Sequence, residues 1–206
     1  IWVPLVFFIF GIMDQLTTYY LPKILKAVGG LPEGAEINIP MPKPPQAFLL
    51  SISEIEFLGF LIIGLASMKL ISGELKSGVY ELILSKPVKY SNYVTAKWSA
   101  ISLLVLVSLF IGLLGGWYYT NILFGKLEFT KFLNSFLIFS VYVLFFISIL
   151  ILVNTWFKRS GPVLFVSLIL LILVGIFTSI FGHKIKWSPS LITSYVTDYL
   201  TQGSIP

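Results

Sequence analysis

The chain lacks cysteine altogether, contains a single histidine, His183, and is poor in charged residues. Without cysteine it has no disulfide bond and no thiolate metal site, and its composition indicates no redox compartment. One histidine and no H-E-x-x-H pattern leave almost no ligands for zinc or copper, so we expect no metal site. A lone loop histidine is most often simply solvated, and a Ser-His dyad would have to use it.

The sequence also lacks the phosphate-binding pattern G-x-x-x-x-G-K-[ST]. We therefore expect no ATPase site and no bound cofactor in this chain, and any ATP and Mg²⁺ would be bound by a partner. A membrane-embedded lipid enzyme is the least favoured class, because no catalytic constellation is present.

Apolar residues are abundant instead: they make up 57% of the chain, against 11% charged residues. The mean hydropathy is +0.94. A soluble domain of 206 residues could not bury this much apolar surface, so lipid must solvate much of it. The net charge of +5 favours contact with anionic lipid headgroups over nucleic acid. The composition thus predicts one multi-pass domain, residues 1–206, in the cell membrane.

Apolar stretches long enough to cross a bilayer define the fold class. A spanning helix needs about 20 mostly apolar residues, and an open strand in lipid would leave its backbone groups unpaired. The predicted fold is an all-α polytopic bundle with five spans, at about 1–21, 52–72, 98–119, 132–156 and 161–181. The odd count and the first residue, Ile1, lead us to expect that the native protein is longer at both ends and has a sixth span.

The segment before the second span is rich in proline. Pro40, Pro42, Pro44 and Pro45 favour an extended path, either as an ordered outer cap or as a simple spacer. Two patterns that fit a capping box, Ser51 with Glu54 and Ser53 with Glu56, then predict the start of the second span. The alternative is that the two carboxylates bind a cation or substrate, but residues two apart point to nearly opposite faces of a helix.

Asp14 is the one acidic residue well inside an apolar run, and it is a candidate intramembrane polar site. It could equally lie near the outer interface, paired with Gln15 or Thr17. On the third span, Gly112 and Gly116 form a small-xxx-small pair that would let another helix approach closely.

The last amphipathic segment, about 189–201, begins with Ser188 and Pro189 and has apolar residues at helical spacing. We expect an outer helix that lies in the membrane interface or packs on the spans.

A polar segment, 73–97, separates the second and third spans, and we call it the coupling segment. Its start has helical periodicity, with an apolar stripe and a polar stripe, and Pro87 is expected to end the helix. The polar stripe consists of Glu74, Gly78, Glu81 and Ser85. The loops on the side of the membrane where the coupling segment lies are short and rich in basic residues, which favours a cytoplasmic location for this segment. Periodicity alone favours a helix that merely rests among the headgroups.

The exact residues favour a docking element. The string SGELKSGVYELILSKPV, from Ser72 to Val88, with Lys97 after it, resembles the signature of permease subunits of type-2 ABC exporters. That signature has Gly-Glu, a basic residue, Gly-Thr, a Glu-Leu-Leu-Leu-Ser run and Pro-Val before a basic residue. Val79 replaces its threonine here, and Lys89 supplies the basic residue.

The resemblance implies six transmembrane helices, a second permease copy or paralogue, and two cytosolic ATPase subunits. It also implies that the loop between the second and third helices docks on the ATPase as a coupling helix. Carried over to this chain, the coupling residues would be Glu74, Gly78, Glu81, Ser85 and Pro87.

The predicted function is therefore the permease subunit of an ATP-driven ABC exporter with an unidentified substrate. The alternative is a stand-alone secondary transporter or channel. That alternative needs ionisable residues at the membrane midplane and inverted repeats. Asp14 is its only candidate residue, and no repeat is apparent.

Overall fold

The structure, a computed structural model, describes residues 2–27, 40–79, 89–181 and 188–203. Within these ranges the chain is helical and contains no strand, as the composition predicts. The elements are α1 (Trp2–Ala27), α2 (Pro44–Glu54), the π-helix η1 (Ile55–Gly59), α3 (Phe60–Ser67), α4 (Ser72–Ser77), α6 (Tyr90–Leu123), α7 (Phe129–Trp156), α8 (Ser160–Phe181), the 3₁₀-helix η2 (Pro189–Leu191) and α9 (Ile192–Gln202).

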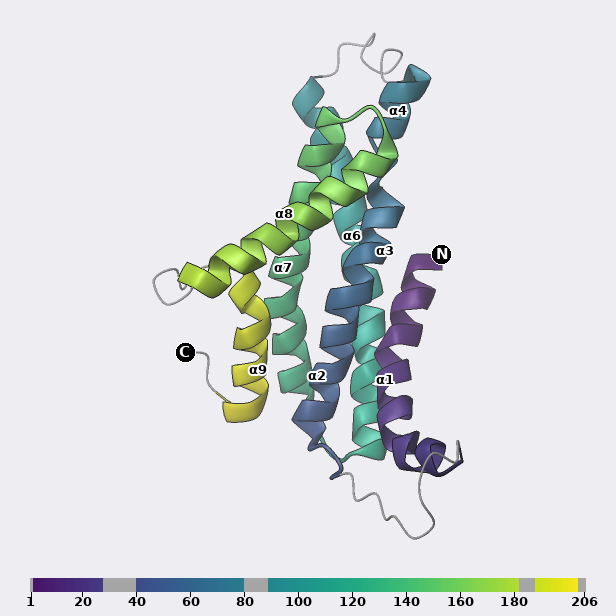
Figure 1. Ribbon diagram of the computed structural model, residues 1–206, viewed down its shortest axis with the longest axis vertical. Coiled ribbons are helices and arrows are strands. Elements are labelled where there is room, and N and C mark those ends of the chain that lie inside the picture. Colours follow the sequence, from purple (N-terminus) through teal and green to yellow (C-terminus); the bar gives the residue numbers. More distant parts are fainter. Residues whose placement is uncertain (1, 28–39, 80–88, 182–187, 204–206) are drawn as a thin grey trace.

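Five of the helical stretches are long and apolar enough to cross a membrane, which confirms the predicted number of spans in the described residues. They are Trp2–Leu25, Pro44–Ser77, Tyr90–Leu123, Phe129–Trp156 and Ser160–Phe181. Figure 1 shows α1, the α2–α3 stretch, α6 and α7 side by side, with α8 crossing α3, α6 and α7 obliquely near the end that carries α4. We call the end that carries α4 and the α7–α8 turn the coupling end, and the opposite end the far end.

The second span begins eight residues earlier than the predicted start at 52, at Pro44. The extended path expected for Pro44 and Pro45 is wrong. Proline fits the first turn of a helix, because the backbone N–H groups of that turn have no acceptor within the helix and the lack of an N–H in proline costs nothing there. Lys43 is the N-cap, and its backbone N–H donates to Gln46 Oε1 over 3.1 Å. The helix start therefore lies at the prolines, and the two predicted capping boxes fall inside the helix.

The serines of those patterns bond elsewhere. Ser53 Oγ donates to the carbonyl of Leu49 within its own helix over 3.0 Å. Ser51 Oγ donates to the carbonyl of Gly11 on α1 over 2.9 Å and accepts from Gln15 Nε2 over 2.6 Å. The capping interpretation of Ser51 and Ser53 is wrong, because a helix interior leaves no free N–H for a cap.

Glycines bring α1 and α6 into backbone contact. A Cβ added to Gly11 would lie 1.9 Å from the carbonyl oxygen of Gly112, and one added to Gly116 would lie 2.6 Å from Ser51 Oγ. No side chain fits at either place, which confirms the close helix approach predicted from Gly112 and Gly116. These contacts join α1, α2 and α6 into one packed unit.

Aromatic rings join α3 to α7. Phe60 lies 4.7 Å from the ring of Phe146 and 5.1 Å from the ring of Tyr142, measured between centroids. All three rings are buried. This contact sets the spacing of the two spans near the middle of the bundle.

The outer helix, expected at about 189–201, packs on the spans. Figure 1 shows α9 running alongside the far-end half of α7. Val196 and Leu200 are fully buried, and Asn134 Nδ2 on α7 donates to the Tyr199 hydroxyl over 2.6 Å. Of the two placements left open by the sequence, packing on the bundle is observed, and the interfacial placement stays a prediction.

Candidate functional site

The coupling segment begins with a helix that is shorter than predicted. Periodicity predicts a helix over Gly73 to Ser85, but α4 ends at Ser77 and Gly78 adopts φ +75°. Glycine takes this left-handed conformation without the steric cost of a Cβ, so it is the usual residue at a helix end. The predicted polar stripe is therefore not one uninterrupted helical face.

Three of the predicted coupling residues, Glu81, Ser85 and Pro87, lie outside the described residues, as does His183. Their roles stay predictions. Among the residues that the structure does describe, no three His, Asp or Glu side chains gather as a metal site would require.

Glu74, the first predicted coupling residue, has partners within the chain. Its Oε1 lies 2.5 Å from Lys97 Nζ, and its Oε2 accepts from the Tyr93 hydroxyl over 2.5 Å. The side chains of Glu74 and Lys97 are each 26% exposed. The carboxylate therefore connects α4 to α6 through contacts within the chain, and its role in coupling stays a prediction.

Asn154 on α7 holds the break between α3 and α4. Its Oδ1 faces the backbone N–H groups of Ile71 and Ser72 at 3.5 and 3.3 Å. Its Nδ2 donates to the carbonyls of Ser67 and Leu150 at 3.1 and 3.2 Å. The amide is fully buried. It satisfies backbone groups that the end of α3 and the start of α4 would otherwise leave unpaired.

Asn154 was not predicted from the sequence. The only signal was an amide within the apolar run of the fourth span, and its contacts with Ser67, Ile71 and Ser72, more than eighty residues earlier, could not be predicted from the sequence.

Asp14, the candidate intramembrane polar site, is half-buried on α1. Glu54 lies close enough for the two carboxylates to repel each other. Gln15 is not its partner, because the Gln15 amide donates to Ala47 and Ser51 on α2. Asp14 does not line the cavity described next, and its role stays a prediction.

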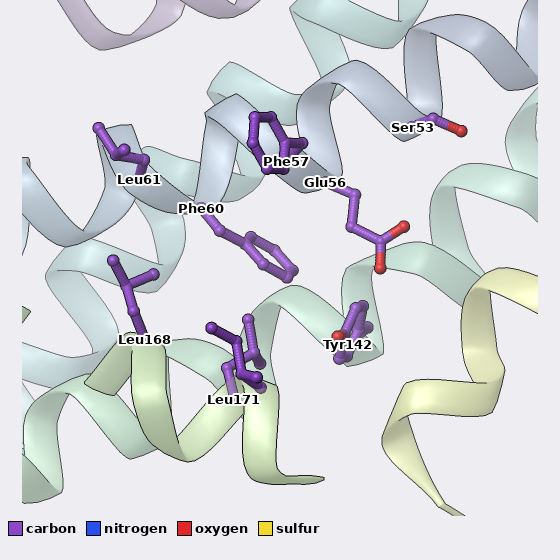
Figure 2. Close-up of a pocket in the computed structure, with 9 residues that line it drawn as sticks. Ser53, Glu56, Phe57, Phe60, Leu61, Tyr142, Leu168 and Leu171 are labelled. Carbon is purple, nitrogen blue, oxygen red and sulfur yellow. The ribbon is translucent and has the colours of Figure 1, made fainter. Parts of the chain in front are cut away.

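A cavity of about 470 Å³ lies between the second span, α7 and α8, and we call it the mid-bundle cavity. Three polar side chains line it, from Ser53, Glu56 and Tyr142. Its remaining walls are apolar and come from Phe57, Phe60, Leu61, Leu168, Leu171 and Ile172. Figure 2 shows the Glu56 carboxylate pointing into the space between its own helix and Tyr142.

Glu56 lies well inside the bundle, although the sequence places it at a membrane boundary. Because the second span starts at Pro44, a rise of about 1.5 Å per residue puts Glu56 about 18 Å along it. Tyr142 is near the middle of α7. Glu56 also belongs to the π-helix η1, an element that often marks functional sites. The sequence offered Glu56 as a ligand-binding residue only as the less favoured alternative to a helix cap, and it did not predict how deep the residue lies.

Hydroxyl groups from η2 and α9 lie close to Tyr142 and Glu56. Thr193 is close enough to interact with Glu56, and Ser190 with Tyr142. The Ser190 Oγ and Thr193 Oγ1 atoms are buried and make no hydrogen bond of good geometry within the described residues. The surroundings of Glu56 and Tyr142 therefore include polar groups from outside the cavity lining.

Comparison with known proteins agrees with this architecture. Residues 6–193 match the model of a family described as "ABC-2 family transporter protein". The chain is 29% identical over 203 residues to "Uncharacterized transmembrane protein YxlG" of Bacillus subtilis (strain 168), which covers 98% of this chain and 79% of that protein. No solved structure matches the chain. Since the family model covers nearly the whole bundle, with the coupling segment and the mid-bundle cavity both inside the matched range, the chain belongs to the ABC-2 family of transporter proteins.

Proposed function

We propose that the chain is the permease subunit of an ATP-driven exporter, and that a cytosolic ATPase subunit docks at its coupling end. Family membership supports the coarser part, a membrane permease component of an ABC transporter. The finer parts are the partner, the energy source and the direction of transport. The partner ATPase would bind ATP and Mg²⁺, because the sequence has no phosphate-binding loop of its own.

One observation carries the proposal: α4 is exposed at its tip and firmly attached at its base. Lys76 and Ser77 are exposed. At the base, Asn154 connects the α3–α4 break to α7, and Glu74 connects α4 to Lys97 on α6. A displacement of the tip would therefore reach three spans as a rigid-body motion. A helix that merely rests among headgroups has no need of such attachments.

A second permease would complete the assembly. α1 and α8 are the least buried spans. Their outer faces carry large exposed apolar side chains, among them Trp2, Leu5, Phe165, Leu173 and Phe177. Lipid or a second copy would cover these faces, and we propose that the functional unit is a dimer of permeases, identical or paralogous.

One observation supports the alternative, a stand-alone secondary transporter. Glu56 supplies the ionisable group inside the bundle that the sequence had offered only in Asp14. Family membership nevertheless favours the ABC transporter. The two functions differ in their energy source, so transport that continues without ATP and follows an ion gradient would favour the alternative.

Site-directed cross-linking tests the docking surface, and the absence of native cysteine makes single-cysteine variants simple to prepare. Lys76→Cys places a thiol at the exposed tip of α4, and Lys126→Cys places one on an exposed residue of the far end. We expect an ABC ATPase, identified by mass spectrometry, to cross-link to Lys76→Cys and not to Lys126→Cys. Equal cross-linking from both positions, or cross-linking from the far end alone, would refute the docking surface.

A matched pair of glycine variants tests coupling. Gly78 and Gly203 both end a helix with positive φ, +75° and +78°, and an added Cβ would meet no atom within 4 Å at either place. Tryptophan therefore strains both turns similarly, at opposite ends of the bundle. We expect Gly78→Trp to insert normally but to lose ATPase stimulation, whereas Gly203→Trp keeps it. If Gly78→Trp leaves both ATPase coupling and assembly intact, Gly78 has no docking role.

A further inference from the structure

We infer that the mid-bundle cavity binds a cationic amphiphile, a molecule with an ammonium-type head group on a hydrocarbon chain. The further claim that this cavity is where an exporter binds its cargo rests on the proposed function, whereas binding of the amphiphile to the cavity does not. The volume of about 470 Å³ lies within the usual range of small-molecule sites, as does the combination of apolar walls with a few converging polar groups.

The charge of Glu56 is the first argument. Within the described residues, the one ion pair is that of Lys97 with Glu74, so no basic side chain there neutralises Glu56. A carboxylate inside a membrane bundle is costly unless it is paired, and such residues most often serve transport. A ligand with a positive charge would supply the missing partner, whereas an anionic ligand would be repelled.

The neighbouring hydroxyl groups are the second argument. The buried oxygens of Ser190 and Thr193 lie close to Tyr142 and Glu56, although neither residue lines the cavity itself, and they make no hydrogen bond of good geometry within the described residues. The Tyr142 ring, in contact with Phe60, adds an aromatic face to which a cation is attracted. The polar corner of the cavity thus matches a head group that is both charged and able to donate.

The apolar walls are the third argument. Phe57 is 78% exposed and Ile172 is 60% exposed, so the cavity opens sideways between the second span and α8. Lipid would surround this opening in a membrane, and a hydrocarbon chain can follow the wall of Phe60, Leu168 and Leu171 inward (Figure 2). An inorganic cation would leave these walls without a partner, so the geometry favours an amphiphile.

Photolabelling in nanodiscs of phosphatidylglycerol tests the inference. One probe is a dodecyl chain with a diazirine beside a primary ammonium head group, and the other carries a sulfate head group on the same chain. We expect the ammonium probe to label peptides that contain residues 53–61 and 168–172, and the sulfate probe to label them weakly. Equal labelling by the two probes would overturn the inference.

Two variants on one helix test the role of the charge. Glu56→Gln should lower labelling by the ammonium probe about tenfold, as expected for loss of a charged contact. Glu54→Gln, which removes a carboxylate that does not line the cavity, should leave labelling unchanged. Unchanged labelling of a folded Glu56→Gln variant, verified by its melting temperature, would overturn the inference.

A second pair tests the cavity itself. Leu171→Trp fills it and should reduce labelling by both probes, whereas Phe165→Trp, at a residue that is 68% exposed and outside the lining, should not. If Leu171→Trp leaves labelling unchanged, the probe binds elsewhere and the inference fails.

The ammonium group can come from a membrane lipid or from a soluble lipophilic cation. Nanodiscs that contain phosphatidylethanolamine distinguish these sources: suppressed labelling identifies the lipid, and undiminished labelling identifies the soluble cation, with the cavity as the ammonium site in both cases. Failure of the proposed function is separable. If labelling depends on Glu56 while no ATPase cross-links to Lys76→Cys, the binding site stands and the exporter assignment falls.

Discussion

Glu56 and Glu74 belong to the same membrane-spanning stretch, Pro44–Ser77, and they have opposite surroundings. Glu74 sits at the coupling end with Lys97 and Tyr93 on its two oxygens. Glu56 sits deep in the bundle at the edge of a cavity, with no basic partner among the described residues.

This difference separates a structural carboxylate from one that is available to a ligand. A paired carboxylate fixes the register of the elements it joins, and its removal leaves a charge without a partner. An unpaired carboxylate adds little to the fold and can be retained for what it binds. The two residues therefore predict opposite responses to the same substitution.

The largest expected effect is at the coupling end, for Asn154→Leu. It leaves the backbone groups of Ser67, Ile71 and Ser72 without their partner, and we expect a loss of about 3 kcal/mol in the free energy of unfolding. The control is Asn134→Leu on the same helix, which loses the side-chain hydrogen bond to the Tyr199 hydroxyl. Thermal unfolding in detergent measures both. A milder effect for Asn154→Leu than for Asn134→Leu would contradict the role given to Asn154.

The next effect tests the ion pair by charge reversal. Lys97→Glu places a second carboxylate beside Glu74, and we expect a loss of about 2 kcal/mol, because the pair is partly buried. Adding Glu74→Lys restores the opposite charges and should recover at least half of the lost stability. A double variant no more stable than Lys97→Glu would show that the pair contributes nothing.

The same substitution at the two carboxylates gives the most direct comparison. Glu74→Gln should lower the free energy of unfolding by about 1 kcal/mol, because it weakens a charge-assisted pair. Glu56→Gln should retain stability, or raise it by up to about 1 kcal/mol, because it removes a charge that has no basic partner among the described residues. Equal losses in the two variants, measured by thermal unfolding, would remove the distinction between them.

The smallest effect is expected for Tyr93→Phe, which removes the hydroxyl that donates to Glu74 but leaves Lys97 in place. We expect a loss below about 1 kcal/mol. The matched control is Tyr118→Phe, at an exposed residue of the same helix, which should be neutral. A loss for Tyr93→Phe larger than that for Glu74→Gln would mean that tyrosine, and not lysine, is the main partner.

The number of spans and one close contact between helices were predicted correctly from the sequence. Runs of apolar residues indicate spans whatever their neighbours do, because backbone groups in lipid must be satisfied within the helix. Gly112 and Gly116 predicted a close helix contact, and Gly11 provides it. The family could also be recognised, because the string from Ser72 to Val88 is distinctive even without coordinates.

Local boundaries were predicted less well, and each error has a physical cause. Ser51 and Ser53 fit a capping pattern, but Pro44 begins the helix and places them inside it. Gly78 fits a helical stripe, but as glycine it is also the residue at which a helix ends most easily, and φ +75° ends α4 there. In both cases one residue type is compatible with two local structures, and packing selects between them.

The sequence by itself was enough to predict that lipid surrounds much of this protein and that the described residues form five spans. It was also enough to recognise the family. Only the tertiary structure decided which polar residues meet. Glu74 finds Lys97 and Asn154 finds the α3–α4 break because helices distant in the chain pack side by side. Glu56 faces a cavity because the start of its helix sets its depth and the packing of α7 and α8 shapes its surroundings. Periodicity fixes the face of a helix, whereas depth and partners depend on contacts between spans that no local pattern encodes.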